Sequence, residues 1–173
     1  MMRPDPQLKW RKPERILAID PGTRELGIAV LEEGENLLYY VVRTMARRAW
    51  QGSVPLKVKT GLRSLIKRHT PTLVTIEQPR QTWRTELVGV VEEIRHAVRE
   101  AQLELIEVEW REVKRLIAGN AQATKRQVAD HLAQRFPELA RYRKIPHVFS
   151  EKYWQRMFDA VAIAVAAANG TLT

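Results

Sequence analysis

Three acidic residues stand at positions where a globular protein normally buries apolar side chains. Asp20 ends the apolar run "RILAID" and is followed at once by a Pro-Gly turn. Glu77 follows the apolar residues of a second run, "LVTIEQP". Asp159 is the single acid within "MFDAVAIAV", part of the last predicted helix. A buried carboxylate costs free energy unless a partner compensates it. Taken singly, each is more often a cap or half of an ion pair than a ligand.

Taken together, the three carboxylates indicate a metal site. Two strand ends and a helix can converge on one point, and converged carboxylates repel one another unless a divalent cation lies between them. Oxygen ligands in a chain without cysteine favour Mg²⁺ or Mn²⁺ over zinc. Two such ions about 4 Å apart would activate a water and stabilise the leaving 3′ oxygen in phosphodiester hydrolysis. Coordinates that hold the three carboxylates far apart, or that tie each one into an ion pair of its own, would overturn this hypothesis.

The charge balance favours a polyanionic partner. The 173 residues include 29 Lys and Arg against 20 Asp and Glu, a formal net charge of +9. Such an excess suits nucleic acid, whose phosphates release counterions on binding, although a solvated basic surface explains it equally well. The chain has no cysteine, a basic and proline-broken N-terminus, and no apolar run long enough for a bilayer. We therefore expect a cytoplasmic protein without a membrane segment.

The apolar periodicities predict an α/β fold. Residues 15–44 contain three short β-rich runs joined by tight turns, which is typical of an antiparallel meander. Further strands are predicted at 73–79 and 103–110, and helices at 55–69, about 81–102, 111–117, 124–136 and 151–168. Residues 137–150 are predicted as a loop because they are rich in helix breakers and basic groups. This order favours a mixed sheet with helices on both faces and ligands at its strand ends.

The chain also carries four blocks that resemble the RuvC-type Holliday junction resolvases of the ribonuclease-H-like superfamily: "IDPGTRELGIAV", "TIEQP", "REVKRLIAGNAQATKRQV" and "DAVAIAV". They occur in the family's order across residues 15–168, whereas chance matches are usually single motifs. The resemblance implies a mixed five-stranded sheet, three antiparallel strands followed by parallel ones, with helices on both faces. It implies one nuclease domain over residues 15–170, preceded by a flexible basic arm at residues 1–14.

The same resemblance implies the residues of the site. Asp20 and Glu77 match the family's first two acids and Asp159 matches its last acid, and together these hold two Mg²⁺ or Mn²⁺ ions. Lys114 and Lys125, eleven residues apart, match two lysines that contact DNA phosphates beside the metals. The family cuts a four-way DNA junction and leaves symmetric nicks with 5′-phosphate and 3′-hydroxyl ends. It does so as a homodimer, which we expect to form here through the helix at about 81–102.

Arg156 departs from the family, which usually has an Asp or His three residues before the last acid. Together with Gln155 it lies one turn before Asp159, close enough to pair with it. One metal ion would then lose a protein ligand, or Arg156 would hold the scissile phosphate of the DNA, or the activity would be impaired.

The segment after Glu77 is a second departure, since it is shorter than in the bacterial enzymes. Trp83 would then be the aromatic wedge at the junction centre, or else a core or dimer-interface residue. Arg80 and Arg84 flank it and are expected to contact DNA as well. These changes would suit a phage or otherwise divergent branch, which places the protein in the cytoplasm of a bacterium or of a phage-infected bacterial cell.

Two alternatives remain open on the sequence. Arg156 motivates a catalytically weakened protein that binds branched nucleic acid without cutting it. A YqgF-like ribonuclease shares the first strand motif, but the long helix after Glu77 and the block with two lysines favour the resolvase.

Overall fold

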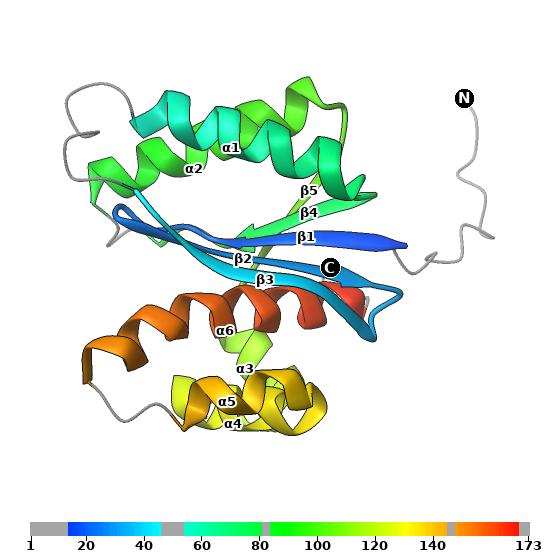
Figure 1. The fold of residues 1–173 in the computed structure, drawn as a ribbon, viewed down its shortest axis with the longest axis vertical. Coiled ribbons are helices and arrows are strands. Elements are labelled where there is room, and N and C mark those ends of the chain that lie inside the picture. Colours follow the sequence, from blue (N-terminus) through cyan, green and yellow to red (C-terminus); the bar gives the residue numbers. More distant parts are fainter. Residues whose placement is uncertain (1–13, 46–53, 81–83, 145–147, 170–173) are drawn as a thin grey trace, which may run out of the picture.

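A single five-stranded sheet with helices on both faces forms the protein, seen here in a computed structural model that describes residues 14–45, 54–80, 84–144 and 148–169. Helices α1 and α2 cover one face, and α3 to α6 cover the other (Figure 1). The strands are β1 (Arg15–Asp20), β2 (Glu25–Glu32), β3 (Asn36–Thr44), β4 (Leu73–Glu77) and β5 (Glu104–Val108). The helices are α1 (Val54–His69), α2 (Thr85–Glu100), α3 (Trp110–Ala118), α4 (Lys125–Arg135), the 3-10 turn η2 (Pro137–Leu139), α5 (Ala140–Arg143) and α6 (Val148–Ala168).

The strand order, β3-β2-β1-β4-β5, brings two acids to one edge of the sheet. Strand β2 runs antiparallel to both β1 and β3, while β4 runs parallel to β1 and to β5. The predicted sheet of three antiparallel strands followed by parallel ones is therefore confirmed. Since Ile19 of β1 is in register with Ile76 of β4, the next residues, Asp20 and Glu77, follow side by side at the carboxyl ends of the two strands.

Alternation along β1 divides the interior between the two faces of the sheet. Ile16 and Ala18 belong to the core under α6, whereas Leu17 and Ile19 belong to the core under α1 and α2. This is the period-2 arrangement of a strand buried on both sides.

Helix α6 lies unusually close to the sheet. All its residues from Met157 to Ala168 are buried, and many of them are alanines. A Cβ atom added to Gly27 of β2 would lie 1.8 Å from the backbone oxygen of Arg156, so the two backbones meet there. Only glycine permits such an approach, and it fixes where the first half of α6 stands.

The structure confirms most predicted elements to within a few residues and corrects two. The capping box predicted at Thr124 is present, with reciprocal hydrogen bonds between Thr124 and Gln127. Helix α6 begins at Val148, three residues earlier than predicted. The prediction of a loop over 137–150 is wrong in its first half, because Pro137 occupies the first turn of η2, where its fixed φ favours helical geometry. The predicted arm, residues 1–14, lies outside the described residues except for Glu14.

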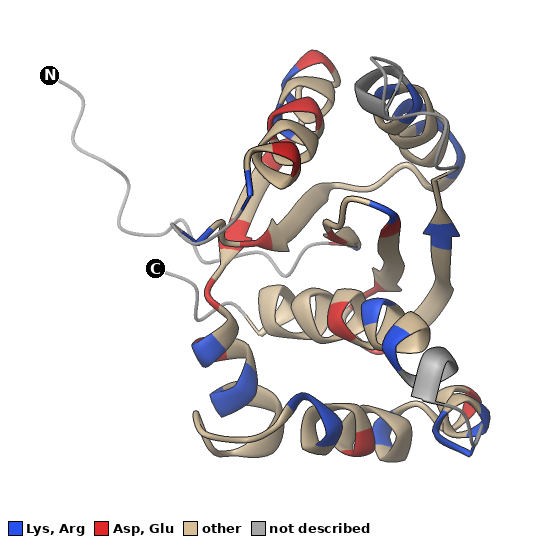
Figure 2. Ribbon diagram, turned by 90° about the vertical axis from the view of Figure 1, so that its left-hand side faces the viewer, with Lys and Arg blue, Asp and Glu red and all other residues tan. Residues whose placement is uncertain are grey.

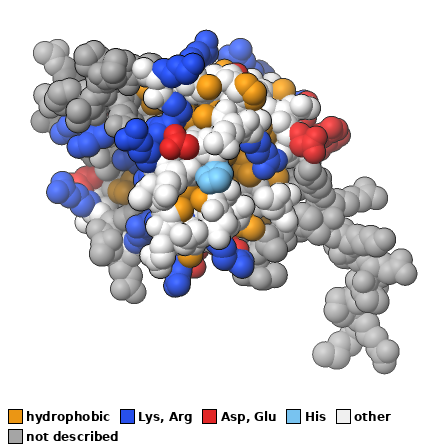
Figure 3. All heavy atoms as spheres, turned by 90° about the horizontal axis from the view of Figure 1, so that it is seen from below, with side chains coloured by type: hydrophobic (Ala, Val, Ile, Leu, Met, Phe, Trp, Pro, Cys, Tyr) orange, Lys and Arg blue, Asp and Glu red, His pale blue; other side chains and the backbone are white. Residues whose placement is uncertain are grey.

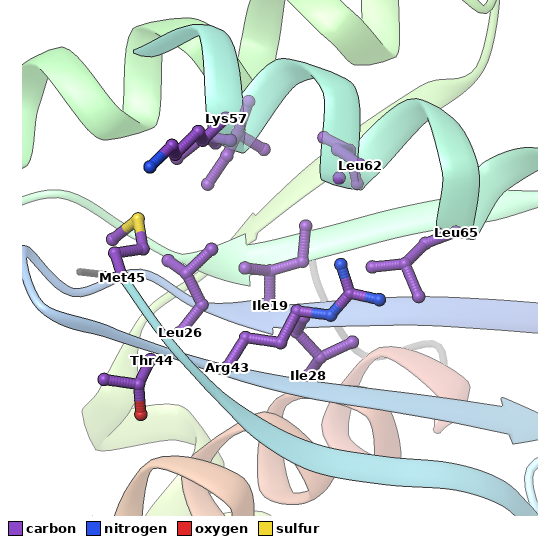
Figure 4. Close-up of a pocket in the computed structure, with 12 residues that line it drawn as sticks. Ile19, Leu26, Ile28, Arg43, Thr44, Met45, Lys57, Leu62 and Leu65 are labelled. Atoms are coloured by element: carbon purple, nitrogen blue, oxygen red, sulfur yellow. The ribbon is translucent and has the colours of Figure 1, made fainter. Parts of the chain in front are cut away.

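An apolar cavity of about 300 Å³ separates α1 from the sheet, and Figure 4 shows its lining. Ile19, Leu26 and Ile28 form its floor, and Leu62 and Leu65 descend from α1. The cavity lies on the face opposite α6, away from Asp159. Among the described residues, no helix combines the length and the apolar character needed to cross a membrane.

Candidate active site at the edge of the sheet

Asp20, Glu77 and Asp159 are all buried, with 1%, 6% and 1% of their surface exposed. Asp20 and Glu77 end β1 and β4, and α6 carries Asp159 across the same sheet. Burial of acidic side chains is rare unless they are paired or bind a cation. The three acids are, with Thr75, the buried polar residues of the described chain.

The three carboxylates act on one another electrostatically. Burial, followed by the charge of Asp159 and with a smaller contribution from Glu77, raises the pKa of Asp20 to about 7. Burial also raises the pKa of Asp159, although Lys125 opposes that shift. A raised pKa of an acid means that its negative charge is not fully compensated. The acids therefore form one electrostatic cluster with a surplus of negative potential at Asp20.

Each carboxylate is held in an ion pair of its own. Arg156 Nη1 lies 3.0 Å from Asp20 Oδ2, and Arg80 Nη2 lies 2.7 Å from Glu77 Oε1. Lys125 Nζ pairs with Asp159 Oδ2. This is the arrangement that the sequence hypothesis named as contrary to a metal site. Within the described ranges, no group of three or more His, Cys, Asp or Glu side chains is close enough together to hold a metal ion.

The chemistry of the cluster nevertheless fits a divalent cation. Its donors are carboxylate oxygens on three separate elements, the ligands that Mg²⁺ and Mn²⁺ prefer. Two of the three pairing cations come from half-exposed side chains: Arg80 is 53% and Lys125 is 44% exposed. Rotation of Arg80 and Lys125 into solvent would free oxygens of Glu77 and Asp159, and a bound divalent cation would offset the cost of leaving these buried carboxylates without their partners.

Gln155 and Arg156 follow the sequence prediction only in part. Gln155 Nε2 donates a hydrogen bond of 2.7 Å to Asp159 Oδ1, as its position one turn earlier predicts. Arg156 instead reaches across to Asp20, and its Nη1 also lies 3.4 Å from the backbone oxygen of Pro21.

A polar cleft of about 660 Å³ adjoins Glu77. Arg80, Arg111 and Lys114 contribute three positive charges to its lining, and Gln78 and Gln122 contribute amides. The remaining lining residues are Pro79, Glu109, Trp110 and Ala121. The predicted DNA-contacting residues Arg80 and Lys114 thus share one basic cleft beside the carboxylates, a lining suited to a phosphate group.

Lys125 stands between the acids and an aromatic ring. While pairing with Asp159, its Nζ also lies 4.7 Å from the centre of the Trp110 ring, at cation–π distance. Trp110 is itself 6% exposed, so its indole forms a fixed wall beside the lysine. Arg84, another predicted DNA contact, is exposed at the start of α2. Trp83 lies outside the described residues, so its two predicted roles stay predictions.

Sequence reasoning missed Trp110, Arg111 and Gly27. Trp110 ends the predicted strand and Arg111 begins the predicted helix that carries Lys114, and only the turn after β5 brings them to the cleft. For Gly27 a signal existed, namely a glycine inside a strand pattern, which commonly marks a close backbone approach.

Basic residues dominate the surroundings of the site. Helix α6 carries no Lys, Arg, Asp or Glu after Asp159, so its last nine residues are uncharged (Figure 2). On the face that carries α4 and α5, Lys and Arg side chains are more numerous than acidic ones (Figure 3).

Known proteins match this chain over most of its length. The family model described as "Crossover junction endodeoxyribonuclease RuvC" matches residues 16–167. The protein of that name from Aromatoleum aromaticum is 30% identical over 132 residues, which cover 72% of this chain and 70% of the relative. The Thermus thermophilus RuvC structure aligns with a TM-score of 0.70 at 22% identity, covering 90% of this chain and 95% of that one.

A second solved structure, T. thermophilus RuvC in complex with Holliday junction substrate, aligns with a TM-score of 0.69 at 20% identity. It covers 90% of this chain and 94% of that one. The family match, residues 16–167, includes both strands and the last helix that carry the three acids. The chain therefore belongs to the RuvC family of crossover junction endodeoxyribonucleases.

Proposed function

We propose that this protein resolves four-way DNA junctions by metal-dependent hydrolysis of phosphodiester bonds. The observation that carries the proposal is the cluster of three buried carboxylates at one sheet edge, beside a basic cleft, in a member of the RuvC family. A relative of the same fold has been captured in complex with Holliday junction substrate, which supports branched DNA as the substrate here.

The carboxylates would hold divalent ions. Asp20, Glu77 and Asp159 supply the oxygens, and the family resemblance implies two ions of Mg²⁺ or Mn²⁺. When bound, such ions supply a nucleophilic water and stabilise the charge on the leaving oxygen. Burial, followed by the charge of Asp159, raises the pKa of Asp20, so its negative charge is only partly compensated and a bound cation would favour the ionised carboxylate.

The basic cleft would hold the DNA strand next to the scissile bond. Lys114 and Arg111 provide fixed positive charge for phosphates, and Arg80 joins them when it leaves Glu77. Lys125, released from Asp159, would remain against the Trp110 ring and face the same strand. Arg80 and Lys125, which pair with Glu77 and Asp159, would thus become phosphate contacts once these carboxylates bind a metal ion.

A homodimer would place two such sites on opposed strands. Helix α2 is the proposed interface, as the sequence predicts from the family resemblance, and it carries Val88, which is 41% exposed. Two symmetric incisions would leave 5′-phosphate and 3′-hydroxyl ends.

One observation favours a second candidate, a protein that binds junctions without cutting them. Arg156 forms an ion pair with Asp20, and a positive charge held at that carboxylate competes with metal ions. In that case the basic cleft would still bind DNA, but no nick would form.

A cleavage assay separates the two candidates. The full-length protein is incubated with a labelled four-way junction, or with a linear duplex of the same arms, in Mg²⁺, in Mn²⁺ or in EDTA. We expect nicks in the junction alone, only with metal, and resealable by DNA ligase. Asp159→Asn is the matched control, which should bind the junction and leave it intact. Binding without nicks in both metals would refute the nuclease and support the second candidate.

A further inference from the structure

Arg156 differs from the other two cations of the site in the way it is held. Its guanidinium donates to Asp20 Oδ2 and lies near the backbone oxygen of Pro21, and the charges of Asp159 and Glu25 also act on it. The guanidinium is thus tied to the carboxylate of the first strand, and the carboxylate of the last helix also acts on its charge.

Two glycines bring the sheet and the turn after Asp20 against Arg156. At Gly27, β2 touches the backbone oxygen of Arg156, which pins this turn of α6 to the sheet. At Gly22, an added Cβ would lie 3.2 Å from Arg156 Cζ, so the guanidinium is seated against the turn that follows Asp20. The Arg156 side chain is 39% exposed, against 44% for Lys125 and 53% for Arg80, which reach the site from other elements.

Charge balance limits what can join a fixed Arg156. Asp20, Glu77 and Asp159 carry three negative charges when ionised, and the three basic partners neutralise them. If Arg80 and Lys125 rotate away, Arg156 and one divalent ion together restore neutrality. A second divalent ion would leave a surplus of positive charge in a buried pocket, which is costly in low dielectric.

We propose that Arg156 takes the place of one of the two metal ions, so that the free protein binds a single divalent ion at this site. The inference rests on the proposed metal-dependent function. The ion would be held by Asp20 and Glu77, with Asp159 as the third oxygen ligand, and the guanidinium would supply a permanent positive charge on the other side of Asp20.

The test counts Mn²⁺ ions on the free protein without DNA. Unbound Mn²⁺ is measured by electron paramagnetic resonance during titration of the full-length chain. We expect one ion per chain for the native protein, one for Arg156→Lys, and two for Arg156→Asp, which exchanges the cation for a ligand. Asp20→Asn is the control that should lose the ion. Two ions on the native protein, or one on a folded Arg156→Asp variant, would overturn the proposal.

A second variant protects the test against misfolding. If circular dichroism shows that Arg156→Asp is unfolded, Arg156→Gln removes the charge while keeping a polar side chain of moderate length. It should bind its first Mn²⁺ at least about tenfold more tightly than the native protein, because a unit charge next to the ion is gone. Unchanged affinity would refute the proposal.

Junction cleavage, measured in parallel, keeps this inference separate from the proposed function. If the native protein binds two ions and cuts junctions, the proposed function stands and the single-ion proposal is refuted. If the native protein binds no Mn²⁺ and makes no nick, both the proposed function and the single-ion proposal are refuted.

Discussion

Carboxylates pair with basic side chains in two parts of this molecule, with opposite consequences. On the outer surface, Glu100 of α2 accepts hydrogen bonds from Lys59 and Arg63 of α1, and these bonds lower its pKa to about 2. At the sheet edge, Asp20 pairs with Arg156, yet burial raises its pKa to about 7. The surface pair favours the charged acid, whereas the buried pair leaves its charge only partly compensated.

The difference shows what each region is built for. A pair between two helices in water contributes modestly to holding them together. A buried carboxylate that stays under-compensated is a cost that the rest of the fold must offset, and such groups are typical of functional sites. The two regions should therefore respond in opposite directions to the same kinds of perturbation.

The largest effect should come from Asp20→Asn. It removes a proposed metal ligand and should reduce junction cleavage by at least about a thousandfold, while junction binding stays close to native. Because it also removes an unfavourable buried charge, the metal-free variant should unfold at a higher temperature than the native protein at pH 8. Cleavage assays and calorimetry in EDTA check both effects. Retained turnover would remove Asp20 from the metal site.

Lys114→Ala should have the next largest effect, on binding rather than on catalysis. Loss of a phosphate contact should weaken junction binding and reduce the slope of log K against log salt concentration by about 1. Lys67→Ala, on the exposed surface of α1, is the matched control and should change neither quantity. Fluorescence anisotropy at several salt concentrations gives the slope, and an unaltered slope for Lys114→Ala would count against a role in the cleft.

The pH dependence of stability should distinguish the two regions more finely. An acid with a raised pKa makes the folded state bind protons that the unfolded chain releases, so its contribution falls as pH rises from 3.8 to about 7. In EDTA, the melting temperature of the native protein relative to Asp20→Asn should thus decline across this range and then level off. A difference that is flat with pH would mean that Asp20 is not strained in the folded protein.

Glu100→Gln should have the smallest effect and the opposite sign. A lowered pKa gives stability that is present above the ordinary value of 4.5 and is lost as pH falls toward 2. At pH 7 the variant should melt only slightly below the native protein, because the pair is solvent-screened. The gap should close in acid, and a large gap at neutral pH would show that the surface pair is structural.

Local patterns were sufficient to predict the elements, and long-range contacts were not. The alternation of β1, the capping box at Thr124 and the hydrogen bond from Gln155 to Asp159 depend on residues close in sequence. The pairing of Arg156 with Asp20 joins residues 136 positions apart, and nothing in the local pattern distinguishes it from a pair with Asp159.

The three acids could be identified because burial of a charge is visible in the pattern of apolar neighbours. Their individual cations could not be identified, because exposed lysines and arginines are common in a chain of net charge +9 and most of them have no specific partner. The basic cleft was missed for a related reason: Gln78 follows β4, Arg111 lies in the first turn of α3, and Gln122 lies between α3 and α4, so these residues meet only in the folded protein.

The contact between Gly27 and the backbone of Arg156 also has a bearing on the order in which the protein matures during its synthesis. The first strands leave the ribosome long before α6, so a growing chain contains Asp20 and Glu77 without the helix that completes their pocket. If Asp159 completes the metal site, as we propose, cutting competence would arise only when the last helix settles onto β2. A truncated or half-made polypeptide would consequently be harmless to the chromosome of the cell that makes it.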